Sequence, residues 1–246
     1  MITDRQGKLL NILIGRYIKS PEPVSSKVLV KFGPFSVSSA TIRYEMNELE
    51  KAGYLTHLHT SGGRVPTTKA YRLYVDNLMA VPNIYVPEVT KQKIHQTITN
   101  ASNDPEELNR VVANIVSVLS DNIVVTNIKD TDYFYKTGLS SLFELPEFRE
   151  FDRIFNVANV FDHFEKVFSR MENEFFGASG DISIFIGDEN PIKNIREEAV
   201  ILARYPLPDK KTGSMTIIGP MRMDYEKNIG LAKCVVNELK NKTKQI

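Results

Sequence analysis

Apolar residues recur at intervals of three and four through the first 80 residues, and this period predicts a series of short helices. The expected helices cover residues 4–19, 25–32, 38–53 and 69–79. Two prolines that follow Ser20 stop the first helix, because proline cannot continue the helical hydrogen bonds. Thr67 or Thr68 is expected to cap the last of the four.

The third of these helices has two chemically different sides. Ile42, Met46 and Leu49 fall at helical spacing and mark the side that packs inward. Gly53 ends the helix, because a residue without Cβ enters the left-handed conformation at low cost. The outward side offers hydroxyls, an amide and one guanidinium, carried by Ser38, Ser39, Thr41, Arg43, Tyr44 and Asn47.

A hairpin is expected directly after this helix. Residues 54–58 have strand-like side chains, and Arg64 begins a return strand that Pro66 closes. Gly62 and Gly63 permit the positive φ angles of a tight turn between the two strands. Three helices and a β-wing predict a winged helix-turn-helix, which places one helix in the major groove of DNA and an arginine beside it.

The remainder of the chain mixes helical and strand patterns and predicts an α+β domain, with helices covering one sheet. The expected helices are residues 106–120, 158–176 and 225–239, and the expected strands are 123–128, 181–186, 199–205 and 214–218. One helix carries an aromatic stripe that resembles a ligand box, but core packing is the interpretation we favour. That stripe consists of Phe161, Phe164, Phe168, Met171 and Phe175.

Two prolines and the lack of a helical period predict a linker at residues 81–87. The expected organisation is therefore a DNA-binding domain at residues 1–80, the linker, and a regulatory and dimerisation domain at residues 88–246. Charge agrees with this division, although a chance fluctuation would look the same. Residues 1–80 hold 11 Lys/Arg against 6 Asp/Glu, and the rest of the chain holds 20 against 24. A basic head on a mildly acidic body fits a DNA-binding domain joined to a domain with another role.

The sequence pattern carries no catalytic or metal-binding constellation, so we expect neither an enzyme nor a cofactor. Cys234, the only cysteine, lies in an apolar run and reads as a small core residue. Residues 162–165 hold an Asp, a His and a Glu, but neighbouring helical positions diverge by about 100° and do not converge on a substrate. His57 and His59 alternate on the wing strand without further ligands. No signal peptide or transmembrane segment is recognisable, which predicts a cytoplasmic protein.

Several segments closely resemble the heat-inducible transcription repressor HrcA family, and they occur in the same order over nearly the whole chain. They include Gly-Gly-Arg-Val-Pro-Thr in the wing and Gly-Pro-Met-Arg-Met-Asp-Tyr before the last helix. The matching segments are residues 23–27, 38–50, 59–67, 71–76, 138–142, 145–148, 186–191 and 218–225.

The resemblance implies a repressor that binds, as a homodimer, a CIRCE-type inverted repeat ahead of chaperone operons. It also implies a GAF-like second domain, reduced in this chain, and dependence on a GroE-type chaperonin. The chain departs from the family in two respects. Tyr44 stands where the family usually has Asn, and the long segment that carries the family's dimerisation subdomain is missing between residues 115–125 and 134–148.

We predict that DNA contacts come from the first loop, the third helix and the wing. The set is Lys27, Ser38, Ser39, Thr41, Arg43, Tyr44, Asn47, Thr60, Ser61 and Arg64. Alternatives remain at this stage: Arg64 as a solvated hairpin charge, Arg43 paired with a carboxylate of its own helix, and one of the serines as a helix cap. Arg222 reads either as a structural partner of carboxylates or carbonyls under the last helix, or as part of an effector pocket. The alternative function is a winged-helix regulator whose GAF-like domain binds a small effector.

Overall fold

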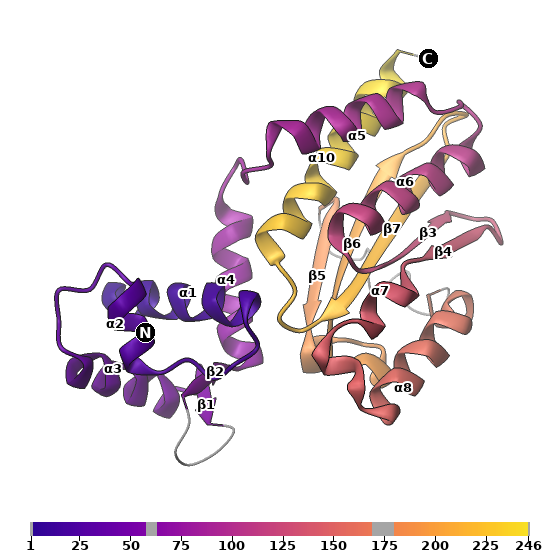
Figure 1. Cartoon of the computed structure of the whole chain (residues 1–246). Helices are drawn as coiled ribbons and strands as arrows, with labels where there is room; N and C mark the ends of the chain where they lie inside the picture. Colours follow the sequence, from indigo (N-terminus) through magenta and orange to yellow (C-terminus); the bar gives the residue numbers. More distant parts are fainter. Residues whose placement is uncertain (1, 58–62, 169–179, 246) are drawn as a thin grey trace. The chain divides into compact units, whose positions relative to one another are not determined.

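The computed structural model describes residues 2–57, 63–168 and 180–245 and divides into two compact units (Figure 1). The first unit is Met1–Pro82 and the second is Asn83–Ile246. Some residues singled out above lie outside the described parts. These are His59, Thr60, Ser61 and Gly62 in the wing, and Met171 and Phe175 in the aromatic stripe.

The N-terminal unit contains four helices and a short hairpin within its described residues. Its elements are α1 (Asp4–Lys19), α2 (Ser26–Phe32), α3 (Ser39–Lys51), β1 (Leu55–His57), β2 (Arg64–Pro66) and α4 (Thr68–Ala80). A serine or threonine hydroxyl caps the start of each helix by accepting a backbone N–H; the caps are Thr3, Ser25, Ser38 and Thr67. Ile42, Met46 and Leu49 are buried, which confirms the inward side predicted for α3.

The end of α3 follows the predicted glycine mechanism in full. Gly53 adopts φ +78°. Its amide donates to Glu50 O at 2.9 Å, and the amide of Tyr54 donates to Leu49 O at 2.9 Å. This pair of bonds is a Schellman motif, and it turns the chain directly into β1.

The wing is anchored to the loop between α1 and α2. Val24 and Arg64 exchange two backbone hydrogen bonds of 2.9 Å and so add a third, single-residue strand beside β2. Gly63 does not have the positive φ angle predicted for it. It is needed instead for close approach, because an added Cβ would lie 2.5 Å from the carbonyl carbon of Val24 and 2.6 Å from that of Pro23.

We therefore expect Gly63→Ala to destabilise the N-terminal unit by about 1–3 kcal/mol, since backbone atoms cannot yield as a flexible side chain can. Thermal unfolding measures the change. Gly15→Ala is the matched control, because Gly15 lies within α1 and a Cβ there would meet nothing within 4 Å. The control should be neutral or stabilising, as alanine favours a helix over glycine. Equal stability of the two variants would contradict the close-approach argument.

The C-terminal unit is built on one five-stranded antiparallel sheet with strand order β4-β3-β7-β6-β5. The strands are β3 (Ile123–Ile128), β4 (Phe134–Thr137), β5 (Ile182–Ile186), β6 (Glu198–Pro206) and β7 (Thr212–Pro220). In the described part of the unit, the labelled α-helices are α5 (Glu88–Asn100), α6 (Pro105–Ser120), α7 (Leu139–Phe143), α8 (Phe151–Asp162) and α10 (Tyr225–Lys244). The same part contains three short 3₁₀ turns: η1 (Pro146–Arg149), η2 (Gly187–Glu189) and η3 (Lys193–Ile195).

Helices cover both faces of this sheet. Figure 1 shows α5, α6 and α10 grouped on one face, where Thr126 of β3 donates to Asn109 O of α6 at 3.2 Å. Ile123 and Val125 point to the opposite face and join an apolar cluster that contains Phe164 and Phe168. Both phenylalanines are 1% exposed, which confirms the core interpretation of this part of the aromatic stripe.

The single helix predicted at residues 158–176 is wrong in its described part. Helix α8 starts earlier, at Phe151, and ends at Asp162. His163 breaks it with φ −112° and ψ 21°, and residues 164–168 form a new helical segment. The bend turns Phe164 and Phe168 into the core.

A short hairpin joins β3 to β4 at the place where the family's inserted segment was expected to be missing. Asp130 takes the left-handed conformation with φ +61°. The Thr131 hydroxyl donates to Ile128 O at 2.8 Å and accepts from the Tyr133 amide at 3.2 Å. The turn is therefore closed by the side chain of Thr131.

None of the helices in the described parts of the chain is both long and apolar enough to cross a membrane.

Candidate nucleic-acid interface

The first turn of α3 is held by its hydroxyl groups. Ser38 is the cap, as expected for one of the serines, and accepts the Thr41 amide at 3.2 Å. Its hydroxyl also bonds the hydroxyl of Thr41 at 3.0 Å. The hydroxyl of Ser39 lies 2.9 Å from that of Ser26, so it ties the start of α2 to the start of α3. Ser38, Ser39 and Thr41 therefore all make hydrogen bonds that stabilise the start of α3. Their contacts with DNA stay predictions.

Arg43 and Tyr44 are the exposed side chains in the middle of α3. Tyr44 is 62% exposed, and Arg43 has no hydrogen bond or ion pair with any residue that the structure describes. The carboxylates of α3 are engaged with other partners: Glu45 with Arg5, Glu48 with Lys51, and Glu50 with Arg64. The alternative that Arg43 pairs within its own helix therefore has no support, and its guanidinium is open to a ligand.

Arg64 joins the wing to α3 and is not a freely solvated charge. Its side chain is 12% exposed, and its Nε donates to Glu50 Oε2 at 3.0 Å. Its Nη2 donates to Asn47 Oδ1. The other oxygen of Glu50 is bonded to His57 Nδ1. These bonds form a chain of polar side chains that connects the hairpin to the outward side of α3. The chain consists of His57, Glu50, Arg64 and Asn47.

Glu45 is a buried charge that the sequence pattern did not reveal. It is 4% exposed, although it lies on a helix that was expected to bury only apolar residues. Arg5 binds its Oε1, and Gln6 Nε2 donates to its Oε2 at 2.9 Å, so α1 and α3 are clamped together. Glu45 stands next to the exposed Tyr44, and only the distant α1 residues explain its burial.

Lys27 is exposed in the first turn of α2. The hydroxyl bond between Ser26 and Ser39 brings this turn, which carries Lys27, to the start of α3. Ammonium and guanidinium groups beside hydroxyl and amide donors suit phosphate oxygens and the acceptor atoms of base edges. Of the predicted set, the structure thus groups Lys27, the α3 residues and Arg64, while Thr60 and Ser61 lie outside the described residues.

In the C-terminal unit, an ion pair joins two of the segments that resemble the family, residues 145–148 and residues 218–225. Arg222 Nη2 donates to Glu147 Oε2 at 2.9 Å, and Arg222 Nε binds the other carboxylate oxygen. The side chains are 13% and 16% exposed. This bidentate contact confirms the interpretation that Arg222 binds a carboxylate. It also fixes η1 to the segment before α10.

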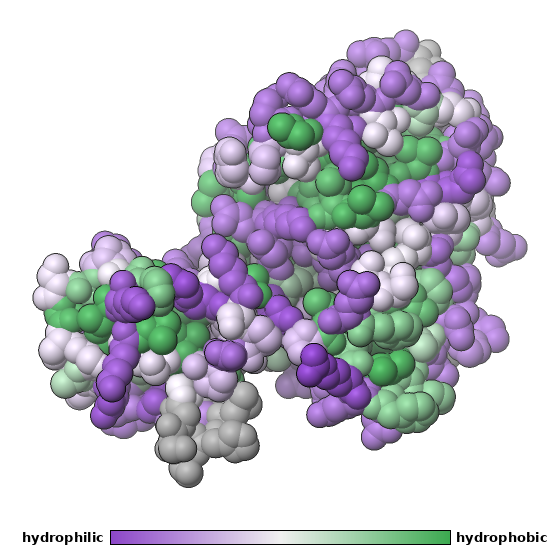
Figure 2. All heavy atoms as spheres, in the orientation of Figure 1, coloured by the Kyte–Doolittle hydropathy of each residue, from purple (hydrophilic) through white to green (hydrophobic). Residues whose placement is uncertain are grey.

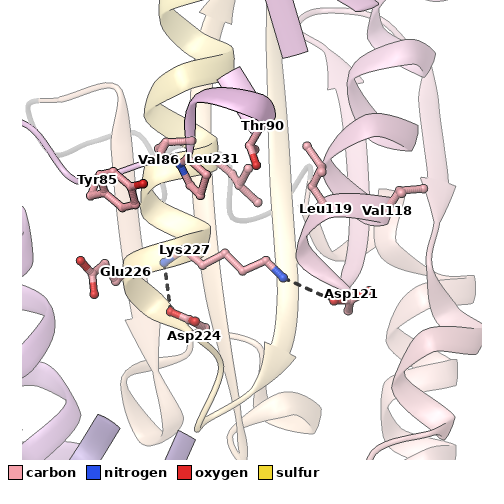
Figure 3. Close-up of a pocket in the computed structure, with 11 residues that line it drawn as sticks. Tyr85, Val86, Thr90, Val118, Leu119, Asp121, Asp224, Glu226, Lys227 and Leu231 are labelled. Atoms are coloured by element: carbon pink, nitrogen blue, oxygen red, sulfur yellow. Dashed lines mark hydrogen bonds and ion pairs between the residues drawn. The ribbon is translucent and has the colours of Figure 1, made fainter. Parts of the chain in front are cut away.

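A cavity of about 570 Å³ lies where α5, α6 and α10 meet (Figure 3). Val86, Leu119 and Leu231 contribute apolar walls. Lys227 Nζ lies 3.4 Å from Asp121 Oδ2, so these two lining residues form an ion pair. The cavity has the size of a small-molecule pocket.

Figure 2 shows apolar side chains gathered in patches on the visible face of the C-terminal unit. Among the residues of this unit that the structure describes, the exposed large apolar ones are Tyr85, Val89, Val118, Phe143, Phe151 and Phe155. Within the described ranges, no three His, Cys, Asp or Glu side chains come close enough together to hold a metal ion. Cys234 is half-buried, and burial raises the pKa of its thiol.

Comparison with known proteins identifies the family. A family model described as the HrcA protein C terminal domain matches residues 42–229. A protein named heat-inducible transcription repressor HrcA from Clostridium acetobutylicum is 27% identical, over 97% of this chain and 96% of its own. A protein of the same name from Brevibacillus brevis is also 27% identical, over 93% of this chain and 94% of its own. A crystal structure described only as a hypothetical protein matches 100% of this chain and 99% of its own with a TM-score of 0.80 and 17% identity, so the two share a fold.

These relatives are transcription repressors, a class of protein that works without catalysis. The chain belongs to the HrcA family. The alignment with the Clostridium acetobutylicum protein runs over 336 positions, whereas this chain has 246 residues, so at least 90 positions have no counterpart here. The relatives are therefore longer than this chain.

Proposed function

We propose that this protein represses chaperone genes by binding a CIRCE-type inverted repeat as a homodimer. In this proposal residues 1–80 act as a winged helix-turn-helix, residues 81–87 as a linker, and residues 88–246 as a reduced GAF-like domain in the cytoplasm. The observation that carries it is the outward side of α3, where Arg43 is open to a ligand and Asn47 is joined to the wing through Arg64. The sheet order, counted within its unit as second, first, fifth, fourth and third, supports the GAF-like assignment.

A dimer follows from the symmetry of the site. One winged helix makes few contacts, and an inverted repeat presents the same half-site twice, related by a two-fold axis. Two copies double the contacts without any new recognition surface. The dimer surface differs from that of longer family members, since the chain lacks their inserted segment.

Heat acts in this proposal through folding and not through a ligand. A smaller domain buries a smaller share of its apolar surface, so its free energy of unfolding is small. Warming reduces the folded population that binds DNA, and the operator opposes that loss by mass action. A GroE-type chaperonin that refolds the chain restores repression, so chaperone level controls its own synthesis.

Operator titration before and after a brief heat step tests the proposal. We expect two copies of the chain on one inverted repeat, loss of binding after heating, and recovery on addition of chaperonin and ATP. Light scattering gives the stoichiometry, and chaperonin without ATP is the control. Full binding well above growth temperature, with no effect of chaperonin, would contradict the heat mechanism. One chain on a complete repeat would contradict the dimer.

The cavity between α5, α6 and α10 favours a second candidate, a regulator whose C-terminal unit binds a small effector. In that case a metabolite changes operator affinity in a dose-dependent manner without chaperonin. The same titration, repeated with metabolite extracts in place of chaperonin, separates the two candidates.

A further inference from the structure

The orientation of the Asn47 side-chain amide is set by its partner. Arginine has hydrogen-bond donors and no acceptor, so the atom that receives Arg64 Nη2 must be the carbonyl oxygen Oδ1. The chemistry of the pair thus fixes which end of the amide faces the wing. The amino group Nδ2, with its two hydrogens, is left for the other side.

Arg64 is held firmly enough to impose this orientation. Its backbone exchanges two hydrogen bonds of 2.9 Å with Val24, and its Nε is bound by Glu50 at 3.0 Å. Glu50 is in turn bonded to His57 through its other oxygen. A guanidinium fixed by its backbone and by a charged partner cannot easily leave Asn47 when a ligand approaches.

Asn47 lies on the side of α3 that carries the other open groups. It follows Arg43 by four residues, and residues four apart on a helix are neighbours on one face. Asn47 is partly exposed, and no hydrogen bond of its amino group to another described residue competes with a ligand.

We propose that Asn47 is a specificity-determining residue that contacts DNA as a donor only, and that Arg64 and Glu50 are the positioning residues that impose this. The inference rests on the proposed function of the N-terminal unit. A free asparagine pairs with adenine by accepting from N6 and donating to N7. Oδ1 of Asn47 already accepts from Arg64 through one of its two lone pairs, which holds this oxygen toward the wing and disfavours that double contact. Bases that present acceptors in the major groove, guanine through N7 and O6 and thymine through O4, match the remaining donors.

Selection of half-sites from a randomised DNA pool tests the inference on the full chain. Asn47→Ala first identifies the operator position whose base preference disappears. At that position the unaltered protein should prefer guanine or thymine over adenine and cytosine by about tenfold. Arg64→Ala releases Oδ1, so the preference should move to adenine even though overall affinity falls. Asn47→Asp replaces the donors with acceptors and should move the preference to cytosine, whose N4 is a donor.

Arg72→Ala is the matched control, since it removes one arginine from the same unit at α4, where Arg72 pairs with Asp76. It should leave the base preference at the Asn47 position unchanged. If Arg64→Ala does not fold, the base that the unaltered protein prefers at the position identified by Asn47→Ala decides the matter. An adenine preference of the unaltered protein, or no operator position that responds to Asn47, would overturn the inference while leaving the repressor proposal intact. Failure of the unaltered protein to select any sequence would overturn both.

Discussion

Replacing Arg153 with methionine should destabilise the C-terminal unit by about 3–5 kcal/mol at neutral pH, because it leaves a buried carboxylate without its partner. Glu198 is 1% exposed at the start of β6. Arg153 reaches it from α8 with two hydrogen bonds of 2.8 Å, and a third bond of 3.0 Å joins Arg153 to Glu197 O. Methionine fills a similar volume but supplies no charge and no donor.

The pH dependence of this loss has a definite sign. Burial raises the pKa of Glu198 above its ordinary 4.5, although the hydrogen bond and charge of Arg153 oppose the rise. A carboxyl whose pKa is raised in the folded state favours the folded protein when it is protonated. This contribution to the free energy of unfolding is fully present below the ordinary pKa and is lost as pH rises through the folded-state pKa. Without Arg153 that pKa rises further. The deficit of Arg153→Met should therefore be smallest near pH 4.5, the ordinary pKa, and larger at neutral pH.

Denaturant unfolding at both pH values measures the effect. Arg149→Met is the matched control, because Arg149 is an exposed arginine four residues earlier in the chain. The double variant Arg153→Met with Glu198→Met should recover most of the loss, since it removes the unpaired charge. If Arg153→Met and Arg149→Met are equally stable, the buried pair does not hold α8 to the sheet.

Arg43→Ala should weaken operator binding by about 1–3 kcal/mol, or roughly 5- to 150-fold, with little change in stability. Arg43 is exposed and has no partner among the described residues, so no folded-state contact is lost with it. A base contact would change the sequence preference, whereas a phosphate contact would weaken binding evenly and reduce its salt dependence.

Titration at fixed salt, with Arg72→Ala as a charge-matched control from α4, checks the result. Arg64→Ala should also lower affinity, but part of its effect comes from releasing Asn47 and Glu50. Affinity equal to that of the unaltered protein in both Arg43→Ala and Arg64→Ala would remove the outward side of α3 and the wing from the interface.

The sequence predicts most elements whose signals are local. Hydroxyl caps, the glycine that ends α3, and the β-branched runs of β3 and β6 act within a few residues, so a single sequence reveals them. Helices α5 and α7 and strand β4 were missed. Helix α5 buries only Ile94 and Ile98, which leaves a weak apolar period, and β4 is a short edge strand without a fully buried residue. Neither presents the strong periodicity on which such predictions depend.

The chemistry of the candidate interface was predictable, but its internal pairing was not. The donors on α3 are visible as residue types, whereas the contacts of Glu45 with α1 and of Arg64 with Asn47 join positions 40 and 17 residues apart. A single sequence shows which groups are present and does not show which of them are already engaged. Arg64, for example, looks like an exposed surface charge in the sequence, whereas in the structure Glu50 and Asn47 bind it and it helps to hold the hairpin against α3.

The self-closed turn between β3 and β4 has a consequence for engineering. Residues 129–132 are exposed, and the ladder with β7 holds β3 in register independently of the turn. Longer relatives align with this chain across at least 90 additional positions. Exposed turns between paired strands are where chains accept inserted domains. We therefore expect this turn to accept a fluorescent reporter or a foreign oligomerisation module without interruption of the sheet.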